Sequence, residues 1–82
     1  MIEEKLRQII SKEVNNIGIN IDTIEYIKEG SNNFLRIIID RDKPINIDEC
    51  VEVTNIINPL LDDANIIEES YILDVSTKEK GE

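Results

Sequence analysis

The first part of the chain places its apolar side chains at helical spacing. The gaps between them are four, three, one, four and three residues, so they share one face of a helix and the charged residues lie outside it. The apolar set is Ile2, Leu6, Ile9, Ile10, Val14 and Ile17. Gly18 follows this set at a position where a left-handed residue commonly ends a helix. The pattern predicts a helix over about residues 2–16.

The apolar period changes to two after this helix. Ile19 and Ile21 share one face of an extended stretch, and Ile24 and Tyr26 resume the alternation after a slip of one residue. A β-bulge near Asp22 explains the slip.

A second extended stretch follows the turn formers at residues 30–33. Its alternation of Leu35, Ile37 and Ile39 completes a predicted hairpin over about residues 19–40. Ile38 makes this strand apolar on both faces. The strand is therefore expected to be either central in its sheet or covered on its second face by a partner.

A second helix is predicted over about residues 47–61. Asn46 and Glu49 have the spacing of a capping box, and acids favour the positive end of the helix dipole. Pro59 is expected to kink or loosen the last turn, before a loop over residues 62–70. The predicted buried stripe is Cys50, Val53, Ile57, Leu60 and Leu61.

A last strand is predicted over about residues 70–76, where Tyr71, Leu73 and Val75 alternate with Ile72 and Asp74. The fold class is therefore α+β, a two-layer α/β sandwich in the order α-β-β-α-β. Two helices cover one face of a three-stranded sheet. The length of 82 residues allows one core, so residues 1–76 form the domain and residues 77–82 a polar tail.

Charge is distributed unevenly along the chain. Residues 1–44 carry eight acids and seven bases, whereas residues 45–77 carry eight acids and no Lys or Arg. Because proteins bind nucleic acids largely by neutralising phosphates, little intrinsic nucleic-acid affinity is expected. A basic protein is the natural partner, although a block of one charge also serves simply as a solvated face.

Several chemistries lack their usual residues. The chain has no His, which removes the commonest general base and metal ligand, and its single Cys50 is predicted to lie in the core. Asp40 and Asp42 alternate as in calcium loops but lack the glycine and the closing glutamate of such a loop. No enzyme, metal or cofactor is predicted. With neither a membrane span nor a secretory signal in the sequence, a cytoplasmic location is expected. The protein is also expected to be a monomer.

Three motifs occur in a specific order: LRIIIDRDKPINIDEC from Leu35, NPLLDD from Asn58 and YILDVS from Tyr71. Together they resemble the amino-terminal domain of RimP-type ribosome maturation factors. The resemblance implies a non-enzymatic, cytoplasmic assembly factor that binds the immature small ribosomal subunit through a ribosomal protein and nearby RNA. The family joins this domain to a carboxy-terminal Sm-like barrel.

The sequence departs from the family pattern after Ser76. The family continues with Ser-Ser-Pro-Gly and a Leu-Asp-Arg-Pro run, which residues 77–82 do not contain. The chain is therefore expected to be an isolated domain or a shortened relative without the barrel.

The predicted partner-binding residues are Arg36, Asp40, Asp48, Glu49 and Glu52. The four acids are expected to face a basic ribosomal protein, because complementary charge speeds encounter and excludes wrong partners. The alternative function is that of a free-standing acidic domain that sequesters or regulates another basic protein.

Overall fold

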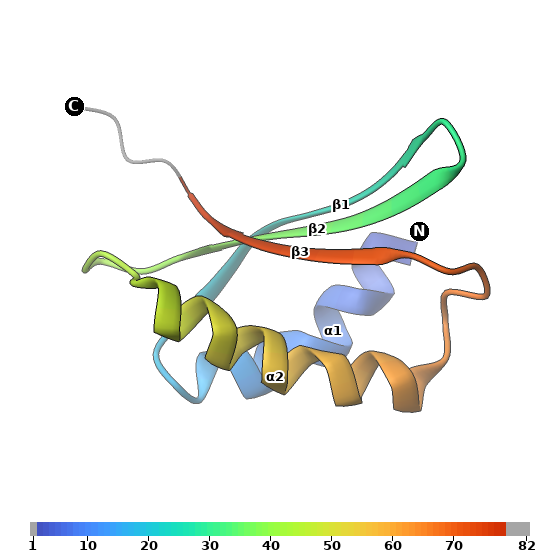
Figure 1. Ribbon diagram of the computed structural model, residues 1–82. Helices are drawn as coiled ribbons and strands as arrows, with labels where there is room; N and C mark the ends of the chain where they lie inside the picture. The colour runs from blue at the N-terminus through green and yellow to red at the C-terminus, as the bar shows by residue number, and fades with distance from the viewer. Residues whose placement is uncertain (1, 79–82) are drawn as a thin grey trace.

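The computed structural model describes residues 2–78. The elements run in the predicted order and are shown in Figure 1: α1 (Ile2–Asn15), β1 (Asn20–Glu29), β2 (Asn32–Asp40), α2 (Ile47–Ala64) and β3 (Ile72–Thr77). The α+β fold class is confirmed. The predicted tail from residue 77 lies mostly outside the described residues, and β3 itself continues through Thr77.

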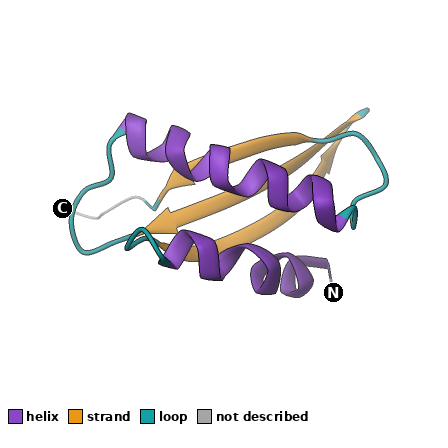
Figure 2. Ribbon diagram, turned by 90° about the horizontal axis from the view of Figure 1, so that it is seen from below, coloured by secondary structure: helices purple, strands orange, loops and turns teal. Residues whose placement is uncertain are grey.

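The sheet has the strand order β1-β2-β3. The β1 and β2 strands form an antiparallel hairpin, whereas β3 returns parallel to β2 after the α2 crossover. Both helices cover the same face of the sheet, as the view from the helix side shows (Figure 2). The β2 strand is therefore central, the first of the two positions that its apolar sequence allowed.

The core is almost wholly aliphatic and lies between the helices and the sheet. In β2, the side chains of Leu35, Ile37 and Ile39 are fully buried, while their alternating neighbours face away from the helices. The other buried apolar residues are Leu6, Ile10, Val14, Ile19, Ile21, Ile24, Val53, Ile57 and Leu61. Cys50 and Leu60 of the predicted α2 stripe are partly buried and pack against this cluster.

The predicted β-bulge is present. The register of β1 against β2 shifts between Ile21 and Thr23. Arg7 of α1 reaches this point and donates to the carbonyl oxygens of Ile21 at 2.8 Å and Asp22 at 3.1 Å. The guanidinium therefore gives these two carbonyl groups a charged donor and joins α1 to the sheet.

Glycines occupy two positions that require positive φ. Gly18 ends the α1 segment with φ of 79°, as its position after the apolar stripe predicted. Gly30 has φ of 60° at the first central position of the hairpin loop. A side chain at either position would favour another backbone conformation.

The α2 helix is longer than the sequence predicted. It continues beyond Pro59 as far as Ala64, where Asn65 adopts a left-handed conformation (φ 49°) and donates to the carbonyl oxygen of Leu61. Pro59 removes one backbone donor, but its partner in a regular helix would be the carbonyl of the exposed Asn55, which water can satisfy. The predicted end at residue 61 was therefore wrong by about one turn.

Candidate partner-binding surface

The solvent side of α2 is acidic. We call this surface the α2 outer face; its exposed residues are Ile47, Asp48, Val51, Glu52, Asn55, Asn58, Pro59, Asp62 and Asp63. Within residues 2–78, no cationic side chain pairs with Asp48, Glu52, Asp62 or Asp63. Four acids therefore face solvent without internal neutralisation.

The first turn of α2 is fixed by a complete capping box. The Asn46 side chain accepts from the Glu49 amide at 2.8 Å, and the Glu49 carboxylate accepts from the Asn46 amide at 3.1 Å. The predicted cap is confirmed. These two bonds satisfy backbone donors that have no partner inside the helix.

Arg41 gives Glu49 a further structural role. Its guanidinium donates to both carboxylate oxygens of Glu49, and it also donates to the Pro44 carbonyl at 2.7 Å. The Arg41 hydrogen bonds, followed by that from the Asn46 amide, lower the pKa of Glu49 to about 2. Glu49 is therefore committed to holding the loop between β2 and α2, and its charge is compensated within the domain.

The remaining two predicted residues lie on another face. Arg36 and Asp40 alternate with the buried residues of β2, so they belong to the sheet face opposite the helices. Arg36 pairs with Asp74 of the neighbouring β3 at 3.3 Å, and its cross-strand neighbour in β1 is Glu25. Arg36 therefore has acids on both sides of it.

The structure thus divides the five predicted residues into three groups. Asp48 and Glu52 share the α2 outer face, one turn apart. Glu49 lies in the ion pair with Arg41, while Arg36 and Asp40 lie on the other side of the molecule. A single flat partner surface does not include all five.

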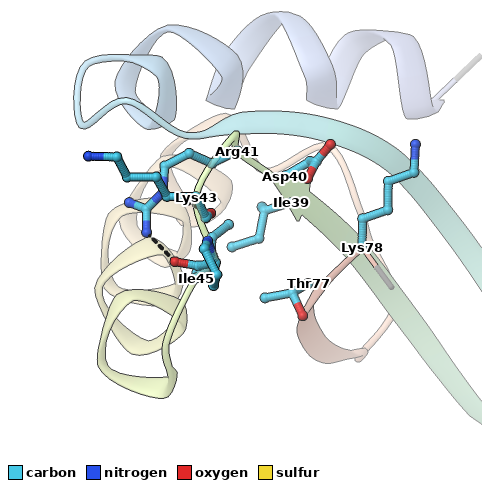
Figure 3. Close-up of a pocket in the computed structure, with 8 residues that line it drawn as sticks. Ile39, Asp40, Arg41, Lys43, Ile45, Thr77 and Lys78 are labelled. Carbon is cyan, nitrogen blue, oxygen red and sulfur yellow. Dashed lines mark hydrogen bonds between the residues drawn. The ribbon is translucent and has the colours of Figure 1, made fainter. Parts of the chain in front are cut away.

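A shallow hollow of about 230 Å³ lies where β2 and β3 end. Figure 3 shows it between Lys43 and Lys78, with Asp40 and Arg41 also on its wall. Lys78 pairs with Asp22 at 3.3 Å, which helps to lower the pKa of that acid after the larger effect of the Thr23 hydroxyl. The wall thus combines cations and an acid, and this mixture specifies no ligand.

Between residues 2 and 78, no three His, Cys, Asp or Glu side chains lie close enough together to hold a metal ion. Neither α1 nor α2 has the combination of length and apolar character that a membrane-crossing helix needs.

The sequence interpretation missed two exposed aliphatic residues on the α2 outer face. Ile47 is 81% exposed and Val51 is 52% exposed. A helical projection gives the signal for Val51, which falls well away from the stripe of Val53, Ile57 and Leu61. Ile47 projects closer to Leu61 and is the first residue of α2, so the projection does not reveal its exposure. Capping analysis alone drew attention only to their acidic neighbours.

The fold and this surface define a small two-layer α+β domain with an acidic helical face. The family model described as "RimP N-terminal domain" matches residues 9–78. The chain belongs to this family. RimP proteins are ribosome maturation factors, so the family places the chain in the biogenesis of the small ribosomal subunit.

A solved structure of a MamM-CTD variant with two alanine substitutions has a similar fold. The two chains are 14% identical, with a TM-score of 0.50 over 95% of this chain and 94% of that one. At this identity the likeness concerns the fold alone.

Proposed function

We propose that this domain contributes to maturation of the small ribosomal subunit by docking the α2 outer face on a basic ribosomal protein. The observation that carries the proposal is the set of uncompensated acids on the exposed side of one helix: Asp48, Glu52, Asp62 and Asp63. Ribosomal proteins supply the opposite charge, and such complementarity accelerates association. Family membership supports the choice of the ribosome over another basic partner.

Asp40 enters this proposal as a flanking residue. Its side chain belongs to the sheet face opposite the helices, but it ends β2 immediately before the loop that leads to α2, so it stays a candidate only for a partner that extends from the α2 outer face around this loop. Arg36 and Glu49 leave the partner-binding set, because the structure gives both of them internal partners. The proposal also treats the protein as a cytoplasmic monomer, the cytoplasm being the expected location of a ribosome maturation factor.

The test reverses charge at Glu52 and Asp40. Association of the Glu52→Lys and Asp40→Lys variants with immature small ribosomal subunits should be slower than for the wild type, and its salt dependence should be flatter. Glu52 is the cleaner probe, because it lies beyond the capping turn and its replacement should leave the thermal midpoint nearly unchanged.

Glu13→Lys on α1 is the matched control, since it makes the same charge change at an exposed helical position on another helix. An equal reduction in that variant would mean that only net charge matters. Wild-type association in all three variants would show that the α2 outer face is merely solvated. Capture of a different basic protein in place of small-subunit components would favour the sequestering function.

A further inference from the structure

The α2 outer face carries two parallel ridges of different chemistry. Ile47 and Val51 are four residues apart, so their side chains lie one above the other on the helix. Asp48 and Glu52 are also four residues apart, and each directly follows one residue of the first pair, so they form a second row beside it. We call these pairs the apolar ridge and the acidic ridge. All four side chains are exposed, with Ile47 at 81% and Val51 at 52%.

The apolar ridge has no role in the core of the domain. The buried side of α2 is supplied by Val53, Ile57 and Leu61, which are at most 5% exposed. A polar residue would be at least as suitable as Ile47 for stability, because burial contributes little at 81% exposure. Protein-binding sites commonly have a desolvated apolar centre and a charged rim. An apolar pair within an acidic surface has this composition.

The ridges are presented on a rigid support. The capping box of Asn46 and Glu49 fixes the first turn, and the Arg41 guanidinium ties that turn to the preceding loop. Thr54 donates to the Cys50 carbonyl at 2.9 Å within the next turn. A partner therefore binds a surface that is already ordered, so binding does not have to offset the entropy cost of ordering it.

We propose that the two ridges recognise a short Lys- and Arg-rich segment that carries an aliphatic side chain between its basic residues. The aliphatic side chain packs between Ile47 and Val51, and the flanking cations lie against Asp48 and Glu52. This inference rests on the proposed function and names the kind of ribosomal-protein segment that the surface takes.

Charge determines the choice of occupant. Residues 45–77 contain eight acids and no base, so a polyanion would be repelled and an acidic peptide would gain nothing. A purely apolar peptide would place its desolvated backbone beside the carboxylates of the acidic ridge and would offer those carboxylates no cation. A basic segment with an aliphatic anchor satisfies both ridges at once.

The first experiment measures binding to immature small ribosomal subunits at several salt concentrations. The Ile47→Gln and Val51→Gln double variant should bind about tenfold or more weakly, mainly through faster dissociation, with an unchanged salt slope. Glu52→Gln should reduce the salt slope instead, because screening acts on charges and not on apolar contacts. Gln forms helices well, so both variants should keep their circular dichroism spectra.

Ile72→Gln provides the matched control. Ile72 is 50% exposed, almost the same as Val51, but it lies on β3 at the sheet face away from the helices. Its replacement should leave binding unchanged. If Ile72→Gln weakens binding as much as the α2 double variant does, exposed apolar area in general is responsible and the proposed ridge is wrong.

The second experiment identifies the occupant by photocrosslinking from position 51. With p-benzoylphenylalanine in place of Val51, the crosslink to immature subunits should map to an aliphatic residue with Lys or Arg within a few positions on both sides. A crosslink to RNA, or to a segment without flanking bases, would overturn the proposal. If wild-type protein binds no small subunits, the proposed function fails. If it binds and the double variant binds equally, only the ridge inference fails.

Discussion

Arg41 and Glu49 form a two-point ion pair across the loop that joins β2 to α2. Arg41 comes directly after the last residue of the central strand, while Glu49 is in the first turn of the helix. The pair therefore fixes where the helix begins relative to the sheet. It also explains why the most acidic part of the sequence does not present all of its carboxylates to a partner.

Glu49→Gln should reduce stability at neutral pH and much less in acid. The folded-state pKa of Glu49 is about 2, below its ordinary value of 4.5, so its contribution is fully present above about pH 4.5. That contribution is lost as the pH falls toward 2. Urea midpoints of both proteins should differ most at about pH 7, differ less at about pH 3 and converge only as the pH approaches about 2. Asp48→Asn is the control, and a difference that stays constant with pH would contradict this account.

Ile57→Asp should prevent folding. The Ile57 side chain is 0% exposed, and a carboxylate there would be desolvated without a partner, which costs at least several kcal/mol in a domain whose total stability is of similar size. Circular dichroism and thermal melting provide the measurement. Asn58→Asp adds the same group at the next, exposed position and should melt like the wild type. A folded Ile57→Asp protein would refute the assignment of the buried α2 face.

Arg7→Ala should lower the free energy of unfolding by about 1 kcal/mol, because two carbonyl groups at the bulge lose a charged donor. Chemical denaturation checks this value. Gln8→Ala, the exposed neighbour on α1, should change the free energy little. Equal effects in the two variants would mean that Arg7 acts only through the helix.

The protein should bind RNA negligibly at physiological salt. Of the four bases near the hairpin and the loop after it, Lys28 pairs with Glu69, Arg36 with Asp74 and Arg41 with Glu49. Lys43 is the fourth, and no acid among residues 2–78 pairs with it. Fluorescence anisotropy with ribosomal RNA fragments tests this expectation. Submicromolar affinity with a steep salt slope would contradict it.

Helix and strand positions followed closely from the sequence. The apolar spacing of α1 and of β2, the glycines at residues 18 and 30, and the capping box at Asn46 each act within a few residues. Local signals of this kind depend on side-chain periodicity and backbone preference, which can be read directly from the amino-acid sequence. The end of α2 was the exception, because the helix continues past the predicted residue 61 to Ala64, where the left-handed Asn65 ends it.

The sequence by itself determined the fold class, the family resemblance and the acidic character of the second half of the chain. Only the tertiary structure decided which charges reach a partner. Arg36 meets Asp74 from 38 residues away, and Arg41 meets Glu49 across a loop. Folding brings the two charged residues of each pair together, so the spacing of residues along the chain does not reveal these ion pairs. The exposure of Ile47 was likewise decided by the tertiary structure, because its position on the helix projects near that of the buried Leu61 and yet the core does not cover the first residue of α2.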